Sequence, residues 1–499
     1  MSVPAPDGAR SFVRFETPGI LALAIFGCLG IFVYLAPLGS WPVGFDVWWN
    51  LHIARMFAES GIPAAVPEAG FTQLARSFAD RQLGFHGLLA LIGGARLGPA
   101  AVPPFVWGLA TLQVVVVFFC ARLANRRVSA LWLFLLPALS STWLFRLTAL
   151  RDMALAVLPL LALLTLLGLP DPAGRRRKFA IAGLAAFFGY VHGAFALPLG
   201  LGLVVRVGHR LAGGALRLGA LVPVLAGLTV ALVVRPDFPA NLELLCTLNV
   251  RMPLGVFSGA LQITPTEFAA PGLGLLLRSS LPALIAAGVL VGLALCRRAA
   301  WPFVLPAVAV SVGAVFGSRL FELAVPLLVI ALAASAGSRR PWIEALVAVA
   351  LLFHMLPTAR QSVRANRFPE LAQVGDWLRD RARPGDVVFV TGWGMTSPLA
   401  WATRGLQLRF TGVTDPSLMW AESPTDFDAW WRIKSAQDPD PIGTLRRHFR
   451  ARFVVFVAGD AAPGHPAGET QRYLLAAIDR FHGVAGRIAG PWYACQLVD

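Results

Sequence analysis

The sequence predicts a polytopic α-helical membrane protein that ends in a small α/β domain. Of its 499 residues, 57% are hydrophobic and only 14% are charged, and the mean hydropathy is +0.66. Apolar runs of spanning length alternate with short arginine-containing loops up to about residue 360. A soluble domain does not carry so many long apolar runs, so these runs are expected to be membrane helices.

The first apolar run, 18–37, is expected to remain as the first span. It follows Arg10 and Arg14, is long for the core of a signal peptide, and lacks a small-residue cleavage site. We expect about eleven spans in all. The other apolar segments are 83–98, 103–121, 129–148, 153–169, 179–206, 217–235, 273–296, 300–317, 321–336 and 342–357.

Two of these regions are expected to be broken. The segment 179–206 is expected to cross the membrane twice, with an interruption at Tyr190-Val191-His192-Gly193. The segment 83–121 is expected to cross once, although it is broken between Gly93-Gly94 and Pro103-Pro104. Interrupted helices at membrane depth are tolerated where they are buried in protein or line a wet cavity. The breaks therefore predict an internal cavity.

Arginine predicts the orientation. The formal net charge is +16, and the basic residues gather in the short loops Arg175–Lys178, Arg206–Arg217, Arg297-Arg298 and Arg339-Arg340. Placing these loops in the cytoplasm puts the N-terminus inside and the C-terminal part outside. Topology and anionic lipid account for the charge, so binding of nucleic acid is not expected.

Two domains are expected. Residues 1–360 form the transmembrane domain, with external loops at 38–82 and 235–272, and residues 361–499 form an extracytoplasmic α/β domain. The second domain is predicted from an amphipathic helix that ends at Pro384-Gly385, from apolar strands at 386–390 and 453–457, and from helical patterns near 424–434, 441–450 and 470–480. It contains no GxGxxG and no P-loop, so a nucleotide site is not supported.

The first external loop is expected to carry the chemistry. Asp46 follows the first span directly and precedes Trp48 and Trp49, and Asp80 lies near the next apolar segment. Acids at a membrane face are candidates for function by default. One of the two acids would act as a base, and the other would orient it or bind a metal. The tryptophans would stack on substrate or anchor the chain at the interface.

Five further residues are candidates for substrate contact: His52, His86, His192, Arg319 and Glu322. His52 would otherwise pack at the interface, and His192 would otherwise bond a carbonyl within its apolar segment. Arg319 would bind a lipid phosphate, for which a guanidinium is well shaped, or would pair with Glu322 at i,i+3. Arg151-Asp152 is interpreted as a self-paired helix cap. No cofactor is expected, and a divalent metal is weakly supported because no D-x-D pattern stands in the loop.

The sequence resembles membrane glycosyltransferases of the GT-C superfamily, and within it a bacterial group of multi-span proteins. The resemblance depends on stretches that occur in the same order along most of the chain. They are Asp46-Val47-Trp48-Trp49-Asn50-Leu51, Phe78-Ala79-Asp80-Arg81-Gln82, Val191-His192-Gly193-Ala194-Phe195, Pro239-Ala240-Asn241-Leu242, Arg319-Leu320-Phe321-Glu322, and Trp377-Leu378 through Gly412-Val413-Thr414-Asp415-Pro416.

This resemblance implies a glycosyltransferase in a bacterial inner membrane. It would move a sugar from a polyprenyl-phosphate carrier to a glycan, lipid or protein acceptor outside the cytoplasm. Asp46 matches the first-loop acid that activates the acceptor, and Asp80 matches the later acid of the same loop. The chain departs from the metal-dependent members of the family in lacking a paired acid beside Asp46. It also has Gly394 after Trp393 where members often have aspartate.

Two other functions fit the same composition. A transporter or flippase of lipid-linked saccharides would share the broken helices, but it should show inverted repeats, and none is visible. A non-catalytic membrane scaffold would bind a partner through the external domain. Acids that face one external cavity would favour the transferase over the scaffold.

Overall fold

The computed structural model describes residues 9–126, 128–170, 174–261, 272–335, 341–412, 415–457, 472–478, 485–489 and 492–497. The basic pair Arg339-Arg340 and the end of the expected 235–272 loop lie outside these residues. The chain folds as two compact units. The helical unit is 1–40, 100–235 and 264–366, and the mixed unit is 41–99, 236–263 and 367–499.

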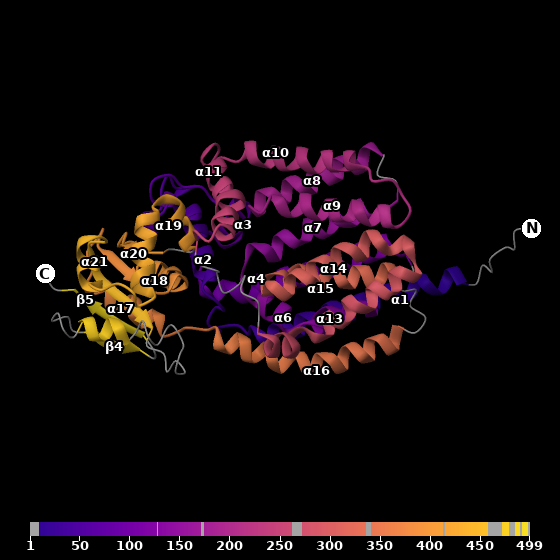
Figure 1. The fold of residues 1–499 in the computed structure, drawn as a ribbon. Helices are drawn as coiled ribbons and strands as arrows, with labels where there is room; N and C mark the ends of the chain where they lie inside the picture. The colour runs from indigo at the N-terminus through magenta and orange to yellow at the C-terminus, as the bar shows by residue number, and fades with distance from the viewer. Residues whose placement is uncertain are drawn as a thin grey trace, which may run out of the picture. The chain divides into compact units, whose positions relative to one another are not determined.

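The helical unit consists of helices that run side by side (Figure 1). They are α1 (Ala9–Leu35), α4 (Val102–Ala124), α5 (Leu135–Leu139), α6 (Ser141–Thr148), α7 (Asp152–Gly168), α8 (Arg175–Val191), α9 (Ala196–Leu211), α10 (Val222–Val234), α13 (Leu273–Cys296), α14 (Trp301–Phe316), α15 (Phe321–Ser335) and α16 (Pro341–Ala365).

The described part of the chain holds six helices that are long and apolar enough to cross a membrane, or seven if the bent pair α5–α6 is one span. Helices α7 and α10 are apolar but shorter. The polytopic α-helical class is therefore confirmed. The count of eleven spans remains a prediction, because length and composition alone do not decide whether the shorter helices cross.

Both expected interruptions are present. Helix α8 ends at Val191 and α9 begins at Ala196, so the break falls where the Tyr190–Gly193 stretch predicted it. Helix α4 begins at Val102, beyond the glycine pair. A third interruption falls within 129–148, whose apolar sequence predicts a single segment. The chain bends by 88° between α5 and α6, where the Ser140 hydroxyl accepts a hydrogen bond from the Trp143 amide and a new helix starts.

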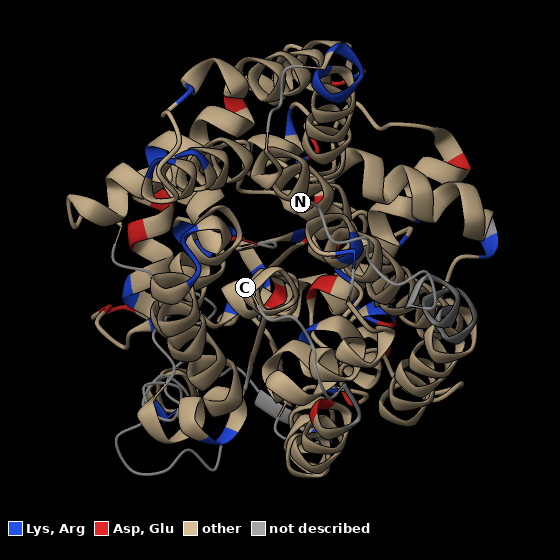
Figure 2. Ribbon diagram, turned by 90° about the vertical axis from the view of Figure 1, so that its right-hand side faces the viewer, with Lys and Arg blue, Asp and Glu red and all other residues tan. Residues whose placement is uncertain are grey.

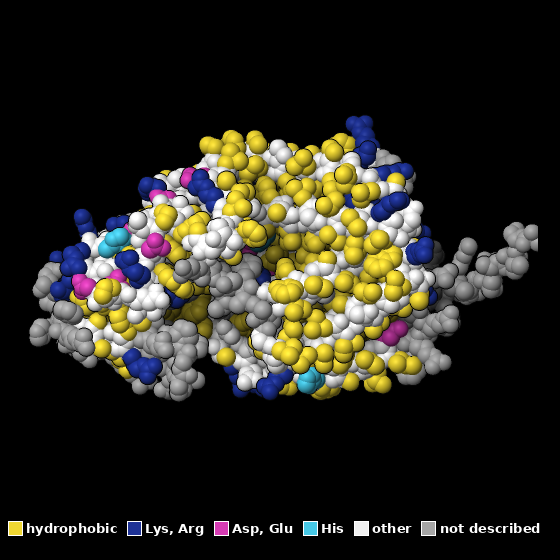
Figure 3. Space-filling view, viewed as in Figure 1, with side chains coloured by type: hydrophobic (Ala, Val, Ile, Leu, Met, Phe, Trp, Pro, Cys, Tyr) yellow, Lys and Arg dark blue, Asp and Glu magenta, His cyan; other side chains and the backbone are white. Residues whose placement is uncertain are grey.

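Helices α7 and α15 form the interior of the helical unit. In α7, 15 of the 17 residues are buried, and 72% of the apolar window of α15 is buried. The outer helices instead present apolar side chains, and yellow covers most of this unit's face in Figure 3. Most of the ribbon in Figure 2 is tan, because charged residues are few along the helices. A surface of this kind is suited to lipid.

The mixed unit is built around a five-stranded sheet of order β2-β1-β3-β5-β4. Strand β1 is parallel to β2 and β3, and β5 is antiparallel to β3 and β4. Its elements are α2 (Asp46–Ser60), α3 (Leu83–Gly93), α11 (Ala240–Cys246), α12 (Met252–Phe257), α17 (Leu371–Arg379), β1 (Val387–Val390), α18 (Thr396–Ala402), β2 (Arg409–Phe410), α19 (Pro416–Glu422), α20 (Pro424–Lys434), α21 (Pro441–Arg447), β3 (Ala451–Val457), β4 (Ala485–Ala489) and β5 (Trp492–Gln496).

Strand β1 is buried on both faces of the sheet, because alternate residues point to opposite sides. Val387 and Phe389 belong to the core cluster that contains Trp430. Val388 and Val390 belong to a second cluster, to which α2 contributes Trp49 and Ile53. The first external loop therefore folds onto the sheet of the C-terminal part. This packing fixes the place of the helix that begins with Asp46.

The expected elements of the C-terminal domain are present. The strands at 386–390 and 453–457 are β1 and β3, and the helical patterns correspond to α20, α21 and 472–478. The strands β2, β4 and β5 were not predicted. Strand β2 has only two residues, β4 contains Gly486 and Arg487, and β5 ends at Gln496, so none of them shows the uninterrupted apolar run that identified β1 and β3.

Candidate active site

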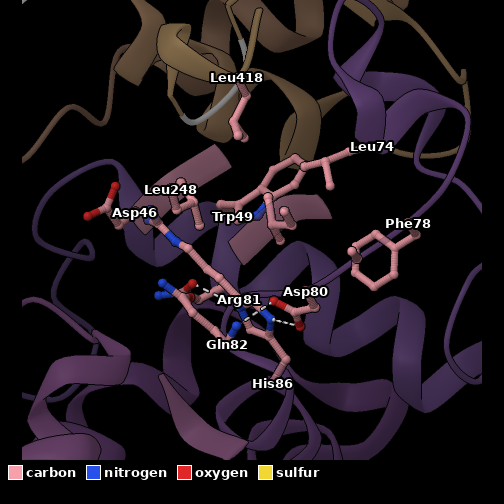
Figure 4. Close-up of a pocket in the computed structure, with 13 residues that line it drawn as sticks. Asp46, Trp49, Leu74, Phe78, Asp80, Arg81, Gln82, His86, Leu248 and Leu418 are labelled. Atoms are coloured by element: carbon pink, nitrogen blue, oxygen red, sulfur yellow. Dashed lines mark hydrogen bonds and ion pairs between the residues drawn. The ribbon is translucent and has the colours of Figure 1, made fainter. Parts of the chain in front are cut away.

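A small cavity in the mixed unit is lined by Asp46 and Asp80 of the first loop (Figure 4). Its volume is about 40 Å³, which holds one or two water molecules but no sugar ring. Helix α2, the segment before α3 and the short helices α11 and α19 contribute its wall. The lining residues are Asp46, Trp49, Asn50, Leu74, Phe78, Ala79, Asp80, Arg81, Gln82, His86, Leu244, Leu248 and Leu418.

Asp80 is held in place by its neighbours. His86 Nδ1 lies 2.6 Å from Asp80 Oδ2, and the Gln82 amide donates to Asp80 Oδ1 at 2.8 Å. The other ring nitrogen of His86 lies 3.0 Å from the side-chain oxygen of Asn50. The Asp80 amide in turn donates to Asp237 Oδ2 at 2.9 Å. Asp80, His86 and Asn50 are all buried, so this network fixes the cavity wall rather than offering a mobile base.

Asp46 has a different setting. It is the first residue of α2 and is half-buried. In Figure 4 its carboxylate points away from the Asp80–His86 pair. A carboxylate in the first turn of a helix is stabilised by the positive end of the helix dipole. Of the two acids in this cavity, Asp46 is the more accessible one.

The two tryptophans of α2 occupy different sites, because successive helical residues point in different directions. Trp49 lines the small cavity. Trp48 lies in a second cavity of about 170 Å³, with Trp41 and Trp401. Their ring centroids are 4.9 Å apart for Trp41–Trp48 and 6.3 Å apart for Trp48–Trp401. The guanidinium of Arg404 lies 4.6 Å from the centroid of Trp401, so this aromatic pocket also carries a positive charge.

His52 is buried behind the cavities and is not among the residues that line either of them. Its Nε2 lies 3.8 Å from Glu68 Oε1, beyond hydrogen-bond distance. Burial lowers the pKa of His52 to about 4, and the charge of Arg404 adds to this shift. Burial also raises the pKa of Glu68. The interpretation as packing therefore fits His52 better than a contact with substrate.

The remaining candidates lie in the helical unit, in a buried cluster of charged residues. His192, which follows α8, is paired through Nδ1 with Asp152 at the start of α7. Glu322, near the start of α15, is paired with Arg146 of α6. Arg151 Nη1 lies 3.9 Å from Glu322. Sequence analysis did not connect these residues, because the partners lie forty and 176 positions apart.

The sequence predicts that Arg151 and Asp152 pair with each other as a local helix cap. In the structure, both residues also make contacts with other parts of the helical unit. Asp152 pairs with His192, which follows α8, and Arg151 lies within ion-pair distance of Glu322 on α15. Arg319 is half-buried in the short helix Ser318–Leu320 that precedes α15. In the described part of the chain, no three His, Cys, Asp or Glu residues lie close enough together to hold a metal ion.

Gly394 has a structural explanation. A Cβ atom at this position would lie 2.6 Å from the ring of Phe45. That ring stacks on Phe368, with centroids 4.4 Å apart and an angle of 4° between the planes. An aspartate at position 394 would displace Phe45, the residue directly before Asp46. The glycine at position 394 therefore leaves room for the ring of Phe45, which packs at the start of α2.

No protein-family model and no curated protein sequence matches the chain. Solved structures do resemble it. An oligosaccharyltransferase from Archaeoglobus fulgidus aligns with 90% of this chain and 70% of its own, at 11% identity and a TM-score of 0.59. AglB from the same organism, in complex with an inhibitory peptide and a dolichol-phosphate, also aligns with 90% of this chain and 70% of its own, at 11% identity and a TM-score of 0.58.

ArnT from Cupriavidus metallidurans, bound to undecaprenyl phosphate, aligns with 96% of this chain and 98% of its own, at 17% identity and a TM-score of 0.57. AglB and ArnT are GT-C glycosyltransferases, so the expected GT-C fold is confirmed. At these identities the likeness is one of fold.

Proposed function

We propose that this chain, which has the GT-C fold, moves a sugar from a polyprenyl-phosphate carrier to a hydroxyl of a glycan, lipid or protein outside the cytoplasm. Asp46 would be the general base. The similar structures support a lipid carrier, because AglB was solved with a dolichol-phosphate and ArnT with undecaprenyl phosphate. The proposed location is a bacterial inner membrane, with the N-terminus inside and the mixed unit outside.

The observation that carries this proposal is that Asp46 and Asp80 line one cavity, and that Asp80 is buried whereas Asp46 is half-buried. Asp80 is buried and hydrogen-bonded to His86 and to the Gln82 amide, so we assign it a positioning role. Asp46 is half-buried and turned away from that network, so it can meet a hydroxyl. A base has to lie within hydrogen-bond reach of the proton that it removes.

The proposed step is a single displacement. Asp46 takes the proton of the acceptor hydroxyl while that oxygen forms a bond to the anomeric carbon of the sugar. The bond from this carbon to the phosphate oxygen breaks, and the polyprenyl phosphate leaves with the electron pair. The proton on Asp46 then passes to water. We assign no step to a metal ion.

The departing phosphate needs a positive partner. Arg81 lines the same cavity as Asp46, so its guanidinium can stabilise the charge that develops there. Sequence analysis noted the motif around Asp80 but gave Arg81 no role. Arg319 of the helical unit remains a separate candidate for contact with a lipid phosphate, as the sequence predicts. Trp49 in the cavity and Trp48 in the aromatic pocket would stack on sugar faces or prenyl units.

The cavity has to widen before a sugar can enter, because about 40 Å³ holds only water. We therefore expect binding of the two substrates to open it, as active sites often close and open around their ligands.

The proposal is tested by transfer of label. Membranes that contain the chain, and matched membranes that lack it, are incubated with a panel of polyprenyl-phosphate pentoses and hexoses that carry a radiolabelled sugar. Label should pass to a lipid, glycan or protein fraction only where the chain is present. Identical label in both membranes with every donor would contradict the proposal. Movement of the intact lipid-linked sugar across the bilayer, without transfer, would indicate a flippase instead.

A further inference from the structure

A groove of about 370 Å³ lies on the surface of the helical unit, where α16 passes the end of α1. Tyr34 contributes from α1, and the remaining wall is one face of α16. Phe353, Leu356, Arg360 and Arg364 lie on that face. No Asp, Glu or His is among the residues that line the groove.

The α16 face changes character along its length. Phe353 and Leu356 are apolar, and Arg360 and Arg364 follow at spacings of four residues, so all four point to the same side of the helix. The distance along the helix from Phe353 to Arg364 is about 16 Å, at roughly 1.5 Å for each residue. A molecule that fits this face has an apolar part several carbon atoms long and an anionic part at one end.

The two arginines make the cationic end. The Arg360 guanidinium lies 4.7 Å from the ring centroid of Tyr34, a contact that holds it over the groove. Arg364 lies one helical turn further on. Arg364 lies in the last turn of α16, where a basic residue interacts favourably with the helix dipole, so its presence alone would need no ligand. The helix dipole does not explain why Arg360 and Arg364 lie at one end of an apolar groove. A ligand that carries both a phosphate and an acyl chain explains this arrangement.

Of the six candidate spans in the described part of the chain, the two helices that form the groove are the least buried. Only 22% of the apolar window of α1 and 17% of that of α16 are buried, against 72% for α15. Phe353 is 76% exposed and Tyr34 is 45% exposed. Lipid therefore has to cover the contact between α1 and α16, and a lipid held there would join the two helices.

We propose that this groove binds an anionic phospholipid of the phosphatidylglycerol type. Its phosphate would lie between Arg360 and Arg364, and an acyl chain would lie along Leu356 and Phe353. The occupant is a phospholipid and not the sugar carrier, because no lining residue can accept a proton from an acceptor hydroxyl. The bound lipid would stabilise the pairing of α1 with α16, and this role does not depend on the transferase activity.

The full chain, purified in detergent, is titrated separately with phosphatidylglycerol, phosphatidylcholine and undecaprenyl phosphate while its melting temperature is followed. Native mass spectrometry counts the bound lipids. Phosphatidylglycerol should raise the melting temperature and remain bound at one copy, and phosphatidylcholine should do neither. In Arg360→Gln/Arg364→Gln the apparent affinity should fall by about tenfold or more, because charge-assisted hydrogen bonds to the phosphate are lost.

The matched control is Arg278→Gln, which removes an exposed arginine from α13 of the same unit and should bind phosphatidylglycerol as the wild type does. If the double variant does not fold, each single variant should show a smaller loss of affinity. Equal binding by the wild type and the double variant would overturn the proposal. So would equal stabilisation by phosphatidylcholine, or stabilisation by undecaprenyl phosphate alone.

Discussion

His86 Nδ1 lies 2.6 Å from Asp80 Oδ2, and both side chains are buried in the wall of the cavity that Asp46 also lines. The pair is local in sequence, six residues apart, and it fixes the segment between the first loop and α3. An acid held in this way positions its neighbours. In the proposed mechanism, the more accessible acid of the same cavity, Asp46, takes the proton.

Asp80→Asn should lower kcat by about 100-fold, because a small misplacement of the cavity wall disturbs the reacting geometry. The KM for the lipid donor should change little. The melting temperature should also fall, since the buried contact with His86 loses its charge. Steady-state kinetics and thermal melting check both effects, with the exposed Asp428→Asn as a control. A higher donor KM with an unchanged kcat would contradict the positioning role.

The Arg146–Glu322 pair should be strongly coupled. Either Arg146→Met or Glu322→Met alone leaves a buried charge without its nearest partner, and we expect a loss of about 3–5 kcal/mol of stability. The double variant replaces both groups with apolar side chains and should regain part of that loss, although Arg151 then lacks its contact with Glu322. Thermal melting of the three variants in detergent measures the coupling. A double variant that loses the sum of the two single effects would show that the charges do not interact.

The buried His52 should make the mixed unit less stable in acid. Its folded pKa is about 4, below the value of 6.5 for a free histidine, so the unfolded chain takes up a proton that the folded chain excludes. The contribution of neutral His52 to the free energy of unfolding is therefore fully present above pH 6.5. It is lost as the pH falls toward 4, and the total loss is about 3 kcal/mol.

In His52→Asn, the fall in melting temperature between pH 7 and pH 4.5 should become shallower. His448→Asn is the matched control, because His448 is partly exposed and paired with Asp426. A profile for His52→Asn with the wild-type slope would mean that other groups cause the dependence on pH.

Two native cysteines test the orientation. Cys246 belongs to the mixed unit and Cys296 ends α13 beside Arg297, and both are exposed. A membrane-impermeant maleimide should label Cys246 in intact cells, and it should label Cys296 only after the membrane is opened. Cys246→Ala and Cys296→Ala identify each signal. Labelling of Cys296 in sealed cells would reverse the proposed topology.

Sequence patterns predicted the elements that depend on local chemistry. The apolar run Val387–Val390 gave β1, and the Tyr190–Gly193 stretch gave the break between α8 and α9. Patterns could not predict which distant residues meet. Nothing local to Asp152 indicates His192 as its partner, and nothing near Glu322 indicates Arg146. These pairings come from the packing of helices, which a single sequence does not show.

The same limit applies to the first loop. The position of Asp46 after the first span predicted a site, and the structure places it in a cavity with Asp80. The packing of α2 on the C-terminal sheet was not predicted, although Trp49 and Ile53 carry the apolar surface for it. Trp48 and Trp49 were treated alike, and the structure separates them because they point to different sides of α2.

The most direct measurement is the initial rate of sugar transfer by Asp46→Asn, compared with wild type and with Glu59→Gln. Glu59 lies on the same helix, is exposed and pairs with Arg55, so its variant makes the same chemical change away from the cavity. We expect Asp46→Asn to lose at least about 100-fold in kcat, since general-base catalysis contributes roughly 10²–10⁴-fold, and Glu59→Gln to retain the wild-type rate. Transfer by Asp46→Asn at the wild-type rate would contradict the assignment of Asp46 as the base.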